Sequence, residues 1–273
     1  MNEEDKTPGP ALQRGRLTLS PDWASLDAPS LDSQLLDLFE LARTFAAPRV
    51  SNYPVGVAAL GASGQVYLGT NLEFSSASLG LTVHAEQSAI ALALNFGESS
   101  IERLAVHAAP CGHCRQFLLE IGSDPWIVTP DAEPRRLSAL VPEAFGPSAL
   151  GSEVFALNAG LATEAFAGLS LTEAARVAAE RSHAPYSQSN AGVALQLEDG
   201  TIVPGSYIES VAFNPSLDPT RAALAVALMA GWPGHRVTAA HLVAGSGSVN
   251  HEQMFEAVLA VAGIEGDAST ETL

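Results

Sequence analysis

The stretches Thr82-Val83-His84-Ala85-Glu86-Gln87-Ser88-Ala89-Ile90 and Pro110-Cys111-Gly112-His113-Cys114 decide how this chain is interpreted. Each is predicted to open a helix, and the second directly follows a β-rich run at 104–109. Alternating strands and helices are typical of a layered α/β domain. His84, Cys111 and Cys114 are therefore expected at the starts of two helices.

The neighbouring elements predict the order β-β-α-β-α-β. The expected elements are a hairpin at 55–60 and 65–68 around Gly61-Ala62-Ser63-Gly64, a helix at 84–94 that stops at Asn95-Phe96-Gly97, a strand at 104–109, a helix at 111–121 and a strand at 126–128. This order predicts a three-layer α/β/α domain with a mixed sheet.

A short helical segment is expected before this domain. Ser30 is a candidate cap for a helix whose apolar stripe is Leu31, Leu35, Leu38, Ala42 and Phe45. The proline-containing residues before it are expected to form a loosely ordered arm.

The sequence repeats itself at an offset of 136 residues. Matches at this offset are Gly56/Gly192, Val57/Val193, Ala58/Ala194, Gly64/Gly200, Gly69/Gly205, Glu73/Glu209, Ala89/Ala225 and Leu92/Leu228. The three glycine pairs predict the same hairpin and the same following turn in both copies. At this offset His84 falls opposite Thr220 and Glu86 opposite Ala222, and the second half has no cysteine. The second copy is therefore expected to be degenerate and to serve packing and assembly.

The predicted domain organisation has three parts. Residues 1–47 form the arm and its helix, residues 48–150 the catalytic domain, and residues 165–265 the degenerate copy.

Composition narrows the classes of partner. The chain has 273 residues, 47% of them hydrophobic, which is enough for packed cores. Thirty acidic against 13 basic residues give a formal net charge of -17, which disfavours nucleic acid as a partner. No apolar run reaches the roughly 20 residues of a membrane span, and Met1–Lys6 lack the pattern of a secretory signal. We expect a cytoplasmic protein with no membrane partner.

His84, Cys111 and Cys114 form a candidate set of zinc ligands. One imidazole and two thiolates leave the fourth tetrahedral position open, as a catalytic site requires. Glu86 is expected to act as the acid and base, because zinc lowers the pKa of bound water to roughly 7. Two alternatives are a closed structural site and a redox pair; the closed site would need a fourth ligand, and there is no third cysteine.

Two neighbouring side chains have open roles. His113 is expected to be a partly exposed histidine, because adjacency to Cys114 makes joint ligation awkward. Arg115 either donates to the thiolates or is a solvated or inter-domain arginine.

The order H-x-E followed by P-C-x-x-C is a signature of zinc nucleobase deaminases. The chain resembles the cytidine deaminase family from about Leu31 to Gly245, and specifically its longer, dimeric branch with a degenerate second copy. The resemblance is carried by 51–56, 69–74, 82–90, 110–117, 142–147 and 182–187. One departure is Ala108, because an aromatic residue commonly stands three places before the first cysteine in related long chains.

The resemblance implies hydrolytic deamination of cytidine and 2′-deoxycytidine, with one Zn²⁺ per subunit of a homodimer. His84, Cys111 and Cys114 match the zinc ligands, and Glu86 matches the proton shuttle. The implied substrate-binding residues are Asn71, Leu72 and Glu73 near the ribose, Tyr53 beside the base, backbone groups at Ala85, and Phe145 from the other subunit.

Each of these binding roles has an alternative. Asn71 and Glu73 suit turn structure after Gly69, and the recurrence of Glu73 as Glu209 indicates some structural use. Tyr53 and Phe145 suit ordinary core or interface positions. Two other functions remain open: deamination of another base or of polynucleotide cytosine, and a non-catalytic, zinc-stabilised protein.

Overall fold

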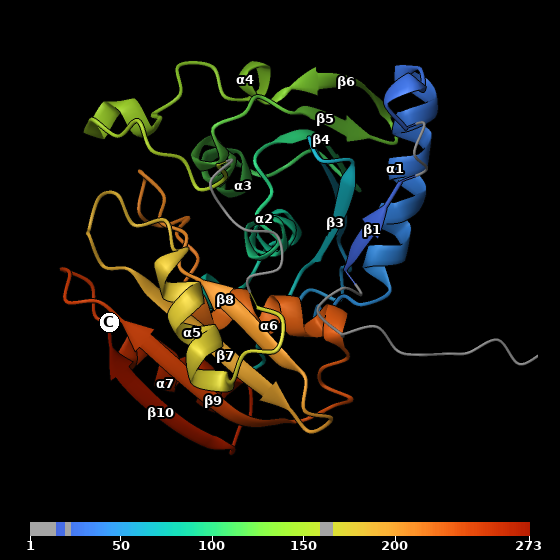
Figure 1. The fold of residues 1–273 in the computed structure, drawn as a ribbon. Coiled ribbons are helices and arrows are strands. Elements are labelled where there is room, and N and C mark those ends of the chain that lie inside the picture. Colours follow the sequence, from blue (N-terminus) through green and yellow to red (C-terminus); the bar gives the residue numbers. More distant parts are fainter. Residues whose placement is uncertain (1–14, 20–22, 159–165) are drawn as a thin grey trace, which may run out of the picture.

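The computed structural model describes residues 15–19, 23–158 and 166–273, in two halves that face each other across a layer of helices (Figure 1). Most of the predicted N-terminal arm, and the predicted start of the degenerate domain at residue 165, lie outside these residues. The three domain boundaries stay predictions.

The N-terminal half contains a mixed sheet in the order β1-β3-β2-β4-β5-β6. Its strands are β1 (Arg16–Thr18), β2 (Gly56–Gly61), β3 (Gln65–Thr70), β4 (Ile101–Val106), β5 (Trp126–Thr129) and β6 (Ala132–Arg136). Only the β4–β5 pair is parallel among them. Helix α1 (Ala28–Arg43) covers one face, and α2 (Ala85–Asn95) and α3 (Gly112–Phe117) lie on the other (Figure 1).

The C-terminal half repeats the central four strands, in the order β10-β9-β7-β8. Its elements are α5 (Leu171–Glu180), β7 (Ala191–Leu197), β8 (Ile202–Ser206), α6 (Pro219–Ala230), β9 (Val237–Ala244), α7 (Glu252–Val261) and β10 (Asp267–Thr272). The β9–β10 pair is parallel, as β4–β5 is. The duplicated three-layer α/β/α fold with mixed sheets is thus confirmed.

Strand register follows the 136-residue offset closely. Val57 pairs with Gly69 and Val106, and Val193 pairs with Gly205 and Leu242. A register irregularity between Leu60 and Gly61 recurs between Gln196 and Leu197. Conserved register and a conserved irregularity are what two copies of one domain would retain.

Two glycine pairs are required, one by close packing and the other by its backbone conformation. A Cβ added at Gly69 would lie 2.2 Å from the Ala85 carbonyl oxygen, and one at Gly205 would lie 2.3 Å from that of Pro219. Gly64 and Gly200 have φ of +80° and +85°, which only glycine adopts readily. The predicted hairpin turn is therefore correct, but Gly69 lies inside β3 and not in a turn.

The same contacts correct the sequence alignment of the helices. Gly69 meets Ala85 and Ala89, whereas Gly205 meets Pro219 and Ala223. The helices are therefore offset by 134 residues, because the segment that links each hairpin to its helix is two residues shorter in the second copy. Asp218 thus corresponds to His84 and Thr220 to Glu86, so the pairing of His84 with Thr220 was wrong.

The two halves share one core. Helices α2 and α6 lie side by side between the sheets, and a single cluster of buried apolar residues includes Leu92, Leu94, Leu224 and Leu228 (Figure 1). Glu120, fully buried in the N-terminal half, accepts hydrogen bonds from the Val211 amide and the Tyr186 hydroxyl of the C-terminal half. The second copy is therefore built into the fold of the first.

Several predicted boundaries change. Asp27, not Ser30, caps α1, because its carboxylate accepts from the Ser30 amide. The buried face of α1 consists of Leu31, Asp32, Leu35, Phe39 and Ala42, while Phe45 lies beyond the helix end. The predicted helix at 111–121 divides into α3 and a 3-10 turn at Leu118–Ile121.

Among the helices of the described residues, none has both the length and the apolar character that crossing a membrane demands.

Candidate metal centre

His84 is held at the N-terminus of α2 by the strand-like segment before it. Leu72 exchanges two backbone hydrogen bonds with Val83, at 3.0 and 2.9 Å, and also bridges to Ala47. His84 itself has extended φ and ψ and caps the helix. Its imidazole is thereby aimed at the start of α3.

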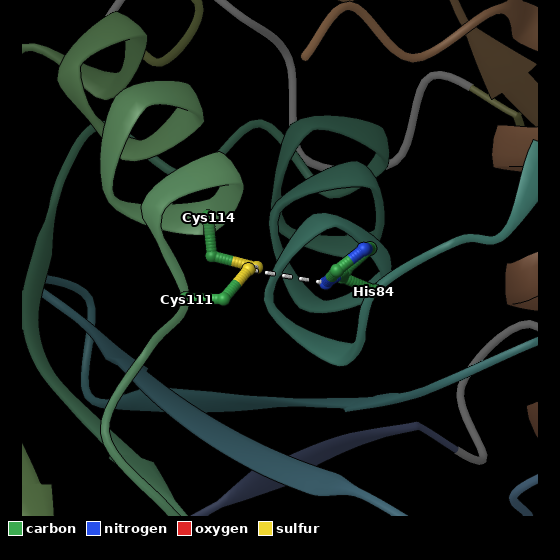
Figure 2. Close-up of side chains that lie close together, drawn as sticks. All are labelled: His84, Cys111 and Cys114. Atoms are coloured by element: carbon green, nitrogen blue, oxygen red, sulfur yellow. Dashed lines mark hydrogen bonds between the residues drawn. The ribbon is translucent and has the colours of Figure 1, made fainter. Parts of the chain in front are cut away.

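Cys111 and Cys114 lie in the first turn of α3, where C-x-x-C spacing directs both sulfurs to one side (Figure 2). Cys111 caps the helix and is exposed, whereas Cys114 is buried, and neither forms a disulfide. Arg115 donates to the carbonyls of Pro110 (2.7 Å) and Leu140 (3.0 Å). Arg115 therefore holds the turn before Cys111. One of its two predicted roles was to donate to the thiolates, and its hydrogen bonds go to these carbonyls instead.

The spacing of the three ligand atoms fits a tetrahedral zinc ion. Cys111 Sγ lies 3.7 Å from Cys114 Sγ and 3.6 Å from His84 Nδ1 (Figure 2). All three ligand atoms lie within 4.8 Å of one another. Zn–S bonds of about 2.3 Å and a Zn–N bond of about 2.0–2.1 Å at tetrahedral angles imply separations of about 3.8 and 3.5–3.6 Å. The donor set and its geometry match a zinc site with three protein ligands.

The electrostatics of the cluster favour one ionised sulfur. Hydrogen bonds from Cys114 and His84 lower the pKa of Cys111 to about 3. The hydrogen bond with Cys111, together with burial, raises the pKa of Cys114, and the hydrogen bond with Cys111 also raises the pKa of His84. The Cys111 thiolate is therefore available as a ligand near neutral pH.

Glu86 lies in the first turn of α2, one helical position past Ala85, and only 4% of it is exposed. Burial raises the pKa of its carboxyl, and a hydrogen bond with Cys114 opposes that shift. The carboxyl therefore lies beside the sulfur cluster. A carboxyl in such a place can exchange a proton with a group bound at the open metal position.

Asn71 and Glu73 are both buried and both hold the loop at 50–55. Asn71 Oδ1 accepts from the Val55 amide and Nδ2 donates to the Tyr53 carbonyl. Glu73 accepts from the amides of Val50 and Ser51 and from the Ser51 hydroxyl.

The second copy shows the same loop contact. Glu209 accepts from the amides of Tyr186 and Ser187, which lie 136 residues after Val50 and Ser51. This copy lacks the cysteines, so the contact serves structure there. The structural use predicted for Glu73 is confirmed.

The other predicted binding residues differ in exposure. Tyr53 and Phe145 are each 50% exposed. The Tyr53 ring lies 5.6 Å from that of His107, and the Phe145 carbonyl accepts from Gln116. Leu72 is fully buried in the core, and Ala85 is buried at the first position of α2. Leu72 therefore contributes to the site through its backbone pairing with Val83, which holds the chain just before His84.

Sequence reasoning missed two contacts of His84. The His113 ring stacks on it, with centroids 4.7 Å apart and planes at 21°. Gln87 Oε1 accepts from the His84 amide, while Gln87 Nε2 donates to the Pro215 carbonyl of the second copy. The stacking is not readable from C-G-H-C, but a glutamine at the third position of a helix is a recognised capping signal.

Comparison with known proteins gives two matches to one family. Residues 29–129 and 137–256 each match the family described as the cytidine and deoxycytidylate deaminase zinc-binding region. Both halves thus match the same family, as expected of a duplication. Zinc is the cofactor of the site formed by the first half.

Curated relatives match most of the chain. It is 43% identical to the cytidine deaminase of Cronobacter sakazakii over 203 residues, which are 74% of this chain and 69% of the relative. It is also 43% identical to that of an Enterobacter species over 223 residues, which are 81% and 75%. A crystal structure of cytidine deaminase from Mycobacterium tuberculosis aligns at 37% identity over 42% of this chain and 96% of that one, with a TM-score of 0.39. The 43% identity to the two curated relatives, over more than two thirds of their length, shows that the chain belongs to the cytidine deaminase family.

Proposed function

We propose that this protein hydrolyses cytidine and 2′-deoxycytidine to uridine and 2′-deoxyuridine, with release of ammonia, as a step of pyrimidine salvage in the cytoplasm. The observation that carries the proposal is the set His84, Cys111 and Cys114 at zinc-ligand spacing, with the Glu86 carboxyl buried beside it. The family membership supports the same reaction.

His84, Cys111 and Cys114 would hold the metal through one imidazole nitrogen and two sulfurs. Zinc, when bound, would lower the pKa of a water molecule there and so supply a nucleophile for C4 of the pyrimidine near neutral pH. Glu86 would accept one proton from the water as its oxygen adds to C4, and would deliver that proton to ring N3. It would then accept the second proton of the same oxygen and deliver it to the 4-amino group, which leaves as ammonia while the C4 carbonyl forms. One water enters and one ammonia leaves, so the carboxylate is regenerated in each turnover.

Substrate binding uses groups around the mouth of the site. Asn71 and Glu73 bind the ribose 3′-hydroxyl with the lone pairs that their loop contacts leave free. Leu72 lies between these two residues near the ribose, backbone groups at Ala85 lie next to the pyrimidine edge, and Tyr53 lies beside the base. The half-exposed Phe145 completes the pocket of a second subunit in a homodimer.

A spectrophotometric assay tests the proposal. Purified protein is incubated with cytidine, deoxycytidine, cytosine, adenosine, guanine and a cytosine-containing single-stranded oligonucleotide, with and without a zinc chelator. We expect comparable turnover of both cytidine nucleosides, no turnover of the others, and loss of activity on chelation. Robust turnover of the oligonucleotide would overturn the substrate, and turnover unaffected by complete zinc removal would overturn the mechanism.

Light scattering after size-exclusion chromatography tests the dimer. A fully active monomer would contradict the role of Phe145 in a second subunit.

A further inference from the structure

Gln87 connects the first zinc ligand to the second copy. Its side chain is fully buried, Oε1 accepts from the His84 amide at 3.1 Å, and Nε2 donates to the Pro215 carbonyl at 2.8 Å. The hydrogen bond to Pro215 is buried, and the one from the His84 amide is partly buried. The backbone of His84 is therefore attached, through the side-chain amide of Gln87, to a segment that lies 128 residues after Gln87 in the chain.

Arg221 makes a second connection from the same segment. This arginine is almost fully buried and ion-pairs with Asp218. Nη1 donates to the carbonyl of Gly80 and Nη2 to that of Ser216, each at 3.2 Å. Gly80 lies in the 3-10 turn Leu79–Leu81, which leads directly into the residues before His84. The second copy thus holds the chain on both sides of the imidazole.

These contacts lie at one end of α2 only. At the other end, the buried Asn95 donates through Nδ2 to the Pro204 carbonyl of the second copy at 2.9 Å. Asn95 and Gln87 therefore form the same kind of bond between the halves, but Asn95 is at the helix terminus remote from the ligands. Comparing the two residues therefore distinguishes two roles: holding the halves together, which both bonds do, and holding His84, which only Gln87 does.

We propose that the segment Pro215–Arg221 of the degenerate copy positions the zinc site of the first copy. Gln87 connects this segment to His84, because its side chain is hydrogen-bonded to both. The inference rests on the ligand role given to His84 under the proposed function. Partners that orient a metal ligand typically affect metal affinity 10- to 100-fold. The second copy is thus part of the machinery that retains the metal, although it holds no ligand.

The test compares zinc release from Gln87→Met and Asn95→Leu. Gln87→Met removes the bond to Pro215 and also the bond from the His84 amide, whereas Asn95→Leu removes the bond to Pro204. Each variant puts an apolar side chain of similar size in place of the amide. The zinc-loaded proteins are mixed with excess chelator, zinc release is followed with a colorimetric zinc indicator, and Tm is measured in parallel. Arg221→Met is prepared as a second variant, which decides the outcome if Gln87→Met does not fold.

We expect both variants to lower Tm, Gln87→Met by the larger amount because it loses two hydrogen bonds. Gln87→Met, and not Asn95→Leu, should release zinc 10- to 100-fold faster than the unmodified protein. Wild-type release from Gln87→Met would overturn the inference, and so would equally fast release from Asn95→Leu. The unmodified protein, assayed for zinc content and cytidine turnover, separates the two claims: zinc without turnover would defeat the proposed function and leave this inference standing.

Discussion

The N-termini of α2 and α6 occupy equivalent places in the two copies, but their capping residues make different contacts. In α2 the cap is His84, whose imidazole faces Cys111. In α6 the cap is Asp218, whose carboxylate accepts from the amides of Thr220 and Arg221 and pairs with the Arg221 guanidinium. One helix terminus presents a ligand, and the other satisfies its own backbone.

The surroundings of the two caps differ in the same sense. Tyr207 stands where the first copy has Asn71, and its hydroxyl donates to Glu209. His251 caps α7 as Cys111 caps α3, and its ring contacts that of Tyr207 with centroids 4.6 Å apart. All of these side chains are buried. The second copy has kept the scaffold and filled the space that chemistry requires in the first.

The largest expected effect tests whether proton transfer belongs to the first copy alone. Glu86→Gln should reduce turnover of cytidine by about 10²- to 10⁴-fold, because an amide cannot shuttle the proton. Zinc content, measured by atomic absorption, should stay unchanged. Thr220→Val alters the equivalent position of the second copy and should leave turnover as it was. Undiminished turnover by Glu86→Gln would refute the assigned role.

The two caps themselves provide a second test. His84→Ala should abolish stoichiometric zinc binding with little change in the stability of the zinc-free protein. Asp218→Ala should leave zinc stoichiometry intact but lower the free energy of unfolding by about 3–5 kcal/mol, because it leaves the buried Arg221 guanidinium unpaired in addition to removing a helix cap. Urea unfolding of both zinc-free variants provides the comparison. The reverse pattern would show that the two termini had been assigned to the wrong tasks.

Glu73 and Glu209, which occupy equivalent positions in the two copies, allow a third comparison. Each accepts two backbone amides from the loop before its hairpin. Glu73→Gln and Glu209→Gln should therefore each cost about 1–3 kcal/mol of stability, from chemical denaturation. Only Glu73→Gln should also raise the KM for cytidine. A matching rise in KM for Glu209→Gln would indicate that loop position, and not ribose contact, controls binding.

The smallest effect concerns acid stability. Burial opposes ionisation of Glu73, but hydrogen bonds from Ser51 and Val50 outweigh it and lower the pKa of the carboxyl below 4.5. The folded state therefore gains stability from this group above the unfolded pKa of about 4.5, and loses it as pH falls through the lower folded value. Unfolding in urea at about pH 6 and 3.5 should show a drop that is smaller in Glu73→Gln. An identical drop in both proteins would contradict the shift.

Much of the fold was predictable because it depends on local pattern. The hairpin, the mixed sheet and the duplication follow from strand periodicity and from glycines at equal spacing. The helix alignment was not, because Leu72 and Val83 are paired in the first copy but Ile208 and Leu217 in the second, a segment two residues shorter. Sliding without gaps cannot detect such a deletion in alanine-rich helices, where shifted residues still match.

The α1 cap had a readable signal that was missed. Pro29 falls in the first turn of the helix, where proline is tolerated, and Asp27, two places before it, is a preferred capping residue. In the candidate site, His84, Cys111, Cys114 and Glu86 are local motif residues and were all named. The loop contacts of Asn71 and the link from Gln87 to Pro215 depend on tertiary packing, which no short-range pattern encodes.

The common core of α2 and α6 also bears on how the duplicated chain evolves. A protein ending after residue 158 would leave one side of α2 in water, along with the unpartnered amides of Gln87 and Asn95. Selection for activity in the first half therefore acts on the apolar residues of the second. A second copy without catalysis does not need zinc ligands, but it cannot be deleted because the first half needs it to fold.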